Sequence, residues 1–318
     1  TIIELMDKSI VLNICGVKSL GGQVVVKSAL NFIEKSNYKI ILLHDNYLLD
    51  DLDIDSNVQK IETSLNRYFH PYLNIFLSKK DMNMINESEA IIHFGNFGFK
   101  TKNKSYTLIQ NLLPLKVKDL KNLILRYFIN KSFKDSDHII YQLDHVAEEI
   151  HNQFGNKLIK IGVIEKFAND INSETGVISI QSLIKNKNSS FMDAVLRKLK
   201  VDNPNLKITK FMSEENQKKS ENKSTLLLEE LPSHSIYLHT SHYETVGLPL
   251  YEASSAGLFV VAPDSLYMEH FDISNSIKYI PGDIESATTS IKDALDAKKE
   301  PFYSLKYIED WNPVLKSI

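Results

Sequence analysis

Short apolar runs alternate with segments of helical periodicity along nearly the whole chain. The runs are rich in Ile, Val and Leu and occupy residues 10–17, 39–44, 90–94, 106–110, 138–142 and 157–163, then 177–183, 206–211, 235–240, 258–262 and 276–280. Parallel strands that are covered on both faces by crossover helices have this continuous apolar character. The sequence therefore predicts an α/β protein built from two doubly wound, Rossmann-like lobes.

The chain length of 318 residues suits two lobes of ordinary size. Residues 164–175 are polar and acidic without periodicity, and we interpret them as the linker. This gives an N-terminal lobe over 1–165 and a C-terminal lobe from 166 to 301. Helices are expected from Gln23 and over 190–200, 248–256 and 285–298, whereas 213–223 is a polar loop or helix. Ligands of such folds bind in a cleft at the carboxyl ends of the strands.

Composition excludes several classes of function. The net charge of −3 gives no overall attraction to nucleic acid, and no run reaches the length of a membrane-spanning helix. The N-terminus lacks the pattern of a secretion signal. A single cysteine, Cys15, lies in an apolar run and is expected to be buried, so a cytoplasmic setting is predicted. No His/Cys cluster suggests a metal site.

Residues 239–263 contain the most informative pattern. A strand ends near Thr240, a loop runs to Gly247, and Pro249 marks the start of a helix that Gly257 closes. Free backbone N–H groups and the positive end of a helix would therefore face a ligand, which favours a diphosphate or sugar hydroxyls.

Two carboxylates bracket this loop. Glu244 precedes it, and Glu252 is expected in the first turn of the helix. A carboxylate there can accept two hydrogen bonds from a vicinal diol such as a ribose. Two glutamates at this spacing are by themselves more often part of a solvated helix surface, but their combination with Gly247 and Pro249 favours a binding site.

The segment resembles a family of enzymes. Glu244-x7-Glu252, with Gly-Leu-Pro between the glutamates and Glu-Ala-x-x-Ala-Gly-x-x-Val-Val from Glu252 onward, is similar to the donor-binding signature of the retaining glycosyltransferases of family 4-like, "glycosyl transferases group 1" type. The resemblance implies the GT-B fold with an interlobe cleft. It also implies transfer of a sugar from a nucleotide-sugar donor to a saccharide or lipid-linked saccharide, with retention, in surface polysaccharide biosynthesis. No metal and no further cofactor are implied.

The resemblance also implies roles for individual residues on the donor side. Glu252 would bind the donor ribose and Glu244 the hexose hydroxyls, and amides would line the sugar and phosphates at Thr245, Val246, Gly247 and Leu248. The place of the family's Arg-x4-Lys phosphate clamp is taken by Ser182 and Lys187. The loss of the arginine should raise the barrier by on the order of a few kcal/mol unless another cation, such as Lys185, substitutes.

Further similarities lie on the acceptor side. Gly21 and Gly22 resemble the glycine-rich loop after the first strand, His93 the histidine that faces the transferred sugar, and Gln110-Asn111 the acceptor-side loop. Trp311 resembles the tryptophan of a final helix, here expected over 302–318, that packs back on the N-terminal lobe. His93, Glu244 and Lys187 are thus the candidate catalytic residues. Gly21-Gly22 as a tight turn, and His93 as a structural histidine, remain equally open interpretations.

Residues 116–134 alternate basic and apolar side chains. They form either an amphipathic helix packed on its lobe or a basic face that contacts anionic lipid at the inner face of the membrane. Two other functions also stay open: a GT-B-like binding or partner protein without turnover, favoured by Ser182, and a nucleotide-sugar epimerase of the same fold.

Overall fold

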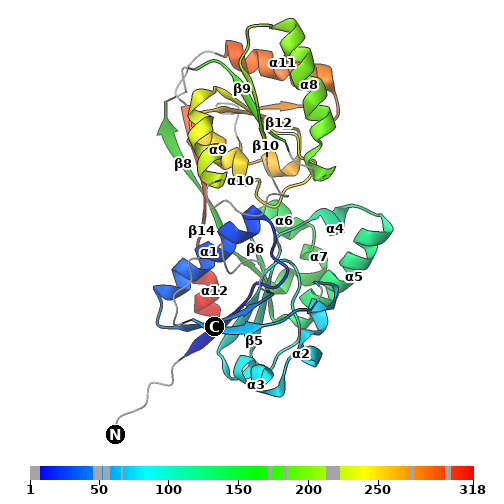
Figure 1. The fold of residues 1–318 in the computed structure, drawn as a ribbon, viewed down its shortest axis with the longest axis vertical. Helices are drawn as coiled ribbons and strands as arrows, with labels where there is room; N and C mark the ends of the chain where they lie inside the picture. Colours follow the sequence, from blue (N-terminus) through cyan, green and yellow to red (C-terminus); the bar gives the residue numbers. More distant parts are fainter. Residues whose placement is uncertain are drawn as a thin grey trace. The chain divides into compact units, whose positions relative to one another are not determined.

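A computed structural model describes residues 8–45, 52, 58–65, 67–170, 174–181, 185–212, 223–271, 276–297 and 302–318. The chain divides into two compact units (Figure 1). Unit 1 comprises Thr1–Val163 and Glu309–Ile318, and unit 2 comprises Ile164–Ile308. Each unit has a parallel sheet and a hydrophobic core of its own.

Unit 1 contains a seven-stranded sheet in the order β3-β2-β1-β4-β5-β6-β7. Its strands are β1 (Ser9–Asn13), β2 (Lys39–His44), β3 (Gln59–Glu62), β4 (Ala90–His93), β5 (Lys104–Leu108), β6 (His138–Tyr141) and β7 (Leu158–Lys160). All neighbouring pairs are parallel. The strand order reverses between β1 and β4, where Asn13 lies in register with His93.

The connections of unit 1 are mostly helical. They are α1 (Leu20–Glu34), the 3-10 helix η2 (Arg67–Tyr72), α2 (Leu73–Phe76), α3 (Lys79–Glu87), α4 (Leu113–Lys116), α5 (Leu120–Asp135), α6 (Asp144–Glu148), α7 (His151–Phe154) and the 3-10 helix η3 (Gly155–Lys157). α1 begins three residues before the predicted Gln23 because Ser19 caps it, accepting a hydrogen bond from the amide of Gly22.

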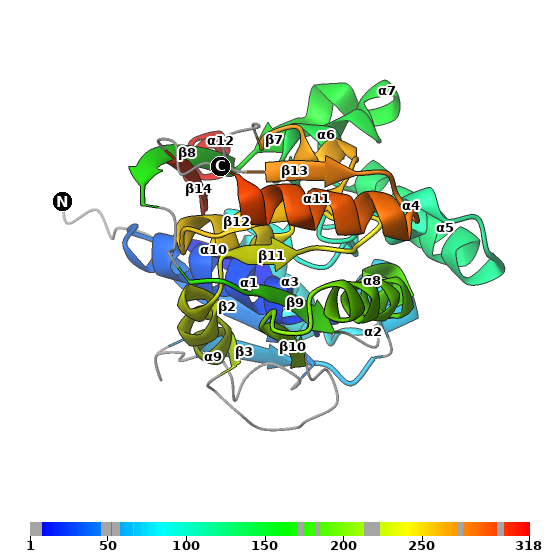
Figure 2. The same ribbon diagram turned by 90° about the horizontal axis from the view of Figure 1, so that it is seen from above.

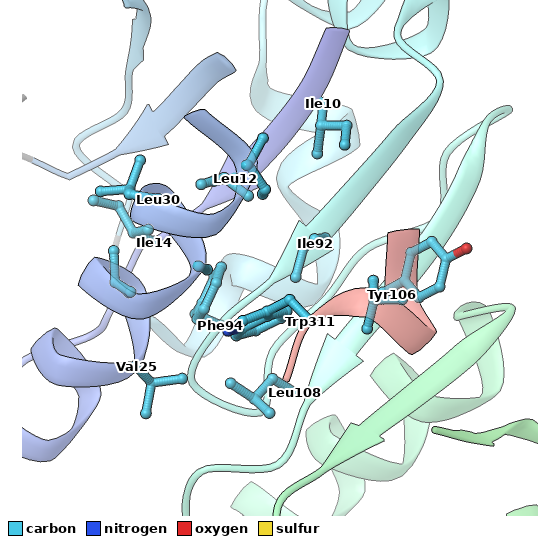
Figure 3. Close-up of a cluster of buried hydrophobic side chains, with 14 of the residues drawn as sticks. Ile10, Leu12, Ile14, Val25, Leu30, Ile92, Phe94, Tyr106, Leu108 and Trp311 are labelled. Carbon is cyan, nitrogen blue, oxygen red and sulfur yellow. The ribbon is translucent and has the colours of Figure 1, made fainter. Parts of the chain in front are cut away.

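Trp311 completes the core of unit 1 (Figure 3). Its side chain is 1% exposed, and its ring centroid lies 6.0 Å from that of Phe94. Its indole N–H donates to the Ser28 hydroxyl of α1 at 3.1 Å. The following helix, α12 (Asn312–Ser317), covers the same core with Val314. The end of the chain is thereby fixed to unit 1.

Unit 2 contains a five-stranded parallel sheet in the order β10-β9-β11-β12-β13. The strands are β9 (Val177–Gln181), β10 (Ile208–Met212), β11 (Ile236–Leu238), β12 (Phe259–Pro263) and β13 (Ser276–Tyr279). Its helices are α8 (Ser189–Asp202), α9 (Lys223–Glu230), α10 (Leu248–Ser255) and α11 (Ile284–Asp296), with 3-10 helices at Lys185–Lys187 (η4), Leu231–Ser233 (η5) and Leu266–Met268 (η6). α8 and α11 pack side by side on the sheet (Figure 2).

Two expectations about the segments between the lobes were wrong. The first half of the expected linker, residues 164–169, belongs to a strand, β8 (Gly162–Asn169), and the expected helix over 302–318 begins instead as strand β14 (Phe302–Glu309). These strands pair with each other in a separate two-stranded sheet. β8 shows no apolar period because only Gly162 of its eight residues is buried. Residues 213–222 lie outside the described part of the chain.

Cys15 is buried, as expected, and burial raises the pKa of its thiol. Among the described residues, no helix has the length and apolar character needed to span a bilayer.

Candidate functional site

Two loops of unit 2 carry the predicted donor-side residues. One follows β9 and contains η4, and the other follows β11 and runs to the start of α10. β9 and β11 are neighbours at the point where the strand order of this sheet reverses. Ligands of open α/β sheets bind at the carboxyl ends of the strands at such a point.

Side-chain and backbone hydrogen bonds hold these two loops together. The Thr240 hydroxyl donates to the carbonyl of Lys187 at 2.7 Å, and the amide of His242 donates to the carbonyl of Asn186 at 3.0 Å. The Asn186 side chain donates to the carbonyl of Tyr243 at 2.7 Å and accepts from the amide of Tyr243 at 3.1 Å. Asn186 was given no role from the sequence, although it fixes one loop on the other.

Lys187 and Glu244 meet across this junction. The Lys187 ammonium lies 2.5 Å from Oε1 of Glu244, and Nε2 of His239 lies 3.3 Å from the same oxygen. The Tyr237 hydroxyl lies 3.1 Å from Nδ1 of His239. When Tyr237 donates to Nδ1, the proton of neutral His239 is on Nε2, the ring nitrogen that lies near the carboxylate. The four side chains therefore form a continuous polar chain.

The surroundings set the charge of each member of this chain. Burial alone would raise the pKa of the Glu244 carboxyl, but the Lys187 ammonium and the His239 ring outweigh it and hold the pKa well below its usual range. Burial lowers the pKa of His239, and its contact with Glu244 offsets this only in part. An ionised Glu244 thus lies beside a neutral histidine and a charged lysine near neutral pH.

The loop before α10 is shaped by a glycine. Gly247 has φ +72°, and a Cβ there would lie 2.7 Å from Cδ1 of Leu250, so a side chain would be strained and crowded. Within the described residues, the amides of Val246, Gly247 and Leu248 donate no hydrogen bond. These free donors lie at the positive end of α10, as the sequence predicts. Thr245 precedes them in the same loop.

Glu252 lies in the second turn of α10 and not in the first, because the helix begins at Leu248. Its side chain is partly buried and makes no hydrogen bond or ion pair within the described part of the chain. Burial raises the pKa of its carboxyl. After burial, the charges of Glu244 and Glu252 both raise the pKa of the Tyr237 hydroxyl, so the two carboxylates approach the same buried group.

The far end of α10 is held by β14 and β8. The Ser304 hydroxyl donates to the carbonyl of Ser254 at 2.5 Å, and the amide of Leu305 donates to the Ser254 hydroxyl at 2.9 Å. Asn169 donates to the carbonyl of Ser255 at 3.1 Å and to Ser304 Oγ at 2.9 Å. The two-stranded sheet therefore orients the helix that carries Glu252.

The predicted acceptor-side residues lie in unit 1 at the corresponding edge of its sheet. Gly22 is buried, and a Cβ there would lie 2.6 Å from Val17 Cγ1, so packing alone explains this glycine. Gly21 is exposed. Asn96, which the sequence analysis missed, accepts from the amides of Gln110 and Asn111 at 2.6 and 3.1 Å.

His93 lies at the end of β4 but is fully buried. Its Nδ1 accepts a hydrogen bond from the Asn13 side chain at 2.9 Å, and its ring centroid is 4.8 Å from that of Phe99. Burial lowers its pKa to about 3. The side chain does not reach the surface of unit 1, and its packing and its hydrogen bond with Asn13 are those of a structural histidine.

Ser182, at the arginine position of the predicted phosphate clamp, lies outside the described residues, and so does the side chain of Lys185, the cation expected as a substitute. Within the described residues, no group of three His, Cys, Asp or Glu side chains is arranged to hold a metal ion.

We compared the chain with known proteins to identify its architecture. No protein-family model and no curated protein matches the chain. Solved structures do match. Sucrose-phosphate synthase from Thermosynechococcus elongatus aligns with a TM-score of 0.60 and 13% identity over 91% of this chain and 90% of that chain. A variant of S. aureus TarM, in complex with fondaparinux, α-GlcNAc-glycerol and UDP, aligns with a TM-score of 0.63 and 12% identity over 91% and 93%.

A third similar structure is Anabaena HepE in complex with UDP and glucose. It aligns with a TM-score of 0.58 and 15% identity over 90% of each chain. Nearly the whole of this chain thus follows the same path as these proteins, which confirms the predicted α/β architecture. The chain has the GT-B fold, with two Rossmann-like units, that is found in glycosyltransferases.

Proposed function

We propose that the protein is a glycosyltransferase that binds a nucleotide-sugar donor in unit 2 and transfers the sugar to a saccharide or lipid-linked saccharide. The observation that carries this proposal is the partly buried carboxylate of Glu252, which has no partner within the described residues. It lies on α10, at whose start the amides of Val246, Gly247 and Leu248 are free. Such a carboxylate gains hydrogen bonds from a diol, and such amides gain them from a diphosphate.

In this proposal the retaining glycosyltransferases of the Glu-x7-Glu type supply the roles. Glu252 binds the donor ribose, and the amides of Thr245 to Leu248 line the sugar and phosphates, together with Gly22 and Ser182. Gly21, Gln110 and Asn111 lie on the acceptor side. Because His93 is buried, its proposed role is indirect: it holds the ends of β1 and β4 in place through its contact with Asn13.

Lys187 and Glu244 are the proposed catalytic pair. The ammonium of Lys187 pairs with Glu244 in the described structure. A donor diphosphate would compete for this ammonium, which would release Glu244 to accept hydrogen bonds from the sugar hydroxyls. The bond between the anomeric carbon and the diphosphate breaks, the acceptor oxygen forms the new bond, and the acceptor proton leaves with the diphosphate. Positive charge and helix-end amides stabilise the leaving group, with retention and without metal or further cofactor.

The proposed setting is surface polysaccharide biosynthesis in the cytoplasm. A lipid-linked acceptor would be presented at a membrane, so the proposal includes peripheral contact of residues 116–134 with anionic lipid. A thermal-shift panel of UDP, GDP, dTDP and CMP sugars tests donor binding, because a ligand that binds the folded state stabilises it. No shift with any nucleotide sugar would contradict the proposal.

Glu252→Gln is the sharpest single test. The variant should lower affinity for the stabilising nucleotide sugar on the order of tenfold or more, because hydrogen bonds to a charged group contribute roughly 1.5–3 kcal/mol. Its melting temperature should stay the same or rise slightly, since the carboxylate is partly desolvated without a partner. Calorimetric titration measures the affinity, and Glu269→Gln, an exposed residue of the same unit, is the control. Equal affinities in both variants would remove Glu252 from the site.

A donor-binding protein without turnover is the second candidate. It is favoured by Ser182 at the arginine position of the clamp and by the pairing of Lys187 with Glu244. Mixing the protein with donor and acceptor lipids separates the two. Donor binding without transfer or hydrolysis supports the second candidate, whereas a glycosylated product supports the first.

A further inference from the structure

His239 is a buried histidine beside the candidate donor site. It directly follows β11, and its side chain is 4% exposed. Its Nδ1 lies 3.1 Å from the Tyr237 hydroxyl. Its Nε2 lies 3.3 Å from Oε1 of Glu244 but is not aligned for a hydrogen bond, and it makes no other hydrogen bond within the described residues. Buried ring nitrogens without a hydrogen bond are uncommon in folded proteins, so this one needs a physical explanation.

Glu244 has a second and closer partner. The Lys187 ammonium lies 2.5 Å from the same oxygen, Oε1. The side chain of Lys187 is 29% exposed and that of Glu244 is 11% exposed, whereas His239 is almost fully covered. A bound diphosphate can therefore reach the ammonium of Lys187 but not the ring of His239. The exposed partner of Glu244 can be drawn away by a ligand, and the buried partner stays in place.

The loss of Lys187 would leave the carboxylate of Glu244 largely buried and without a cation, which is unfavourable. Sugar hydroxyls can donate hydrogen bonds to it but carry no charge. The titratable and charged groups around His239 are Tyr237 on β11, Tyr267 on η6 with its ring centroid at 5.8 Å, Tyr279 on β13, whose hydroxyl donates to the His239 carbonyl at 2.9 Å, Glu244, Lys187 on η4 and, next to Tyr237, Glu252 on α10. Of these groups, only Lys187 and His239 can carry a positive charge.

We propose that His239 is a positioning residue that replaces Lys187 as the partner of Glu244 when a diphosphate binds, and that it takes up one proton in doing so. The proton comes from solvent and adds to Nδ1, where the Tyr237 hydroxyl turns from donor to acceptor. Nε2–H then donates to the carboxylate. Glu244 stays ionised and oriented toward the sugar hydroxyls while Lys187 neutralises the diphosphate. The inference rests on the proposed function for the ligand and deepens it, because it couples donor binding to pH.

The electrostatic surroundings of His239 favour this exchange. Burial lowers the pKa of His239 and the charge of Lys187 lowers it further, whereas Glu244 raises it. Movement of the Lys187 ammonium to a diphosphate removes one cause that disfavours the charged ring and keeps the cause that favours it. The bound state then holds one more proton than the free state, so affinity for the ligand rises as the pH falls.

The first test needs no donor. Two-dimensional NMR of protein with ¹⁵N-labelled histidine reads the tautomer and charge of each ring, and His239→Gln identifies the His239 signal. Lys187→Gln should move the titration of His239 to higher pH by about one unit or more. Lys210→Gln, which removes the same charge from the ion pair with Asp193 in unit 2, should not move it. An unchanged titration of His239 in Lys187→Gln would overturn the inference.

The second test uses wild-type protein, so it does not depend on the folding of Lys187→Gln. Inorganic pyrophosphate, which supplies a diphosphate without base or sugar, should move the His239 titration in the same direction. The absence of this shift would overturn the inference.

The third test measures affinity for the stabilising nucleotide sugar by calorimetry at several pH values. Wild-type affinity should rise as the pH falls from about 8 to about 6, by at most roughly tenfold per pH unit. His239→Gln, which cannot take up the proton, should lose this dependence, whereas a purely structural role would lower affinity equally at every pH. Equal pH dependence in both proteins would overturn the inference. If no nucleotide sugar binds, the proposed function fails, and the two NMR tests still decide whether His239 replaces Lys187.

Discussion

At the scale of single residues, the two glutamates of the Glu-x7-Glu pattern lie in opposite environments. Lys187 and His239 lower the pKa of Glu244, whereas burial without a partner raises that of Glu252. Titratable groups whose surroundings push their pKa values apart often perform different tasks in one site. Here Glu244 is already satisfied by the protein, and Glu252 is available for a ligand.

The lowered pKa of His93 leads to a prediction of how the stability of the protein changes in acid. Its pKa is about 3 in the folded chain, against an ordinary value of 6.5, because the buried ring cannot be charged without loss of solvation. The unfolded chain therefore binds one more proton at this residue between these values. The neutral His93 ring makes its full contribution to the free energy of unfolding above pH 6.5. This contribution is lost as the pH falls toward 3, at up to about 1.4 kcal/mol per pH unit.

Comparison of wild type with His93→Gln isolates this contribution. Glutamine keeps an acceptor for Asn13 but cannot take up a proton. The unfolding free energy of wild type should fall more steeply than that of the variant as the pH is lowered from about 6 to about 4. Denaturant titrations at several pH values measure both. Parallel curves would mean that His93 can be protonated in the folded protein.

The sequence could suggest candidate donor-side residues but not how they are held. Glu244 and Lys187 became candidates because each lies in a local pattern that resembles that of a known family. Asn186 and His239 carried no such signal, since their contacts join residues on loops that come together only in the folded sheet. Asn96 escaped notice for the same reason, because its positive φ and its hydrogen bonds to the next loop are properties of the tertiary structure.

At the scale of elements, the central strands were the most predictable. β2 has the predicted bounds, because a strand that is buried on both faces reads as an unbroken apolar run. β3 was missed because only Ile61 of its four residues is buried. β8 and β14 were missed because neither has a continuous apolar face, and each is stabilised mainly by pairing with the other.

The hydrogen bonds between β14 and the end of α10 lead to a prediction for Ser304→Ala. Ser304 is fully buried and bonds both Ser254 and Asn169. Its removal leaves the buried carbonyl of Ser254 and the half-buried side-chain amide of Asn169 without this partner, which should cost about 1–3 kcal/mol of stability. Because α10 carries Glu252, nucleotide-sugar affinity should fall as well.

Denaturant unfolding and calorimetry measure the two effects on Ser304→Ala. Lys306→Gln, which changes an exposed residue of the same strand, should alter neither. A variant that loses stability but binds the donor like wild type would show that the hydrogen bonds of Ser304 support the fold of unit 2 and not the orientation of α10.

At the scale of the whole molecule, both units use the same design. In each sheet the strand order reverses once, between β1 and β4 in unit 1 and between β9 and β11 in unit 2. In unit 1 the candidate residues Gly21 and Gly22 follow β1, His93 ends β4, and Gln110 and Asn111 follow the next strand, β5. The Asn13–His93 contact and the Lys187–Glu244 contact each join the loops or ends of these strands. Because each unit has its own core, a ligand bound by one unit should stabilise that unit first.

Hydrogen exchange with and without the stabilising nucleotide sugar tests this division. Protection should appear in peptides that cover η4 and residues 239–256, because the free amides of the α10 loop would become hydrogen-bonded to the ligand. Glu252→Gln at the same ligand concentration should lose most of this protection. Additional protection near Gly22 or Gln110 would reveal contact of the ligand with unit 1. Protection confined to unit 1 would contradict the proposal, because Lys187 and Glu244 lie in unit 2.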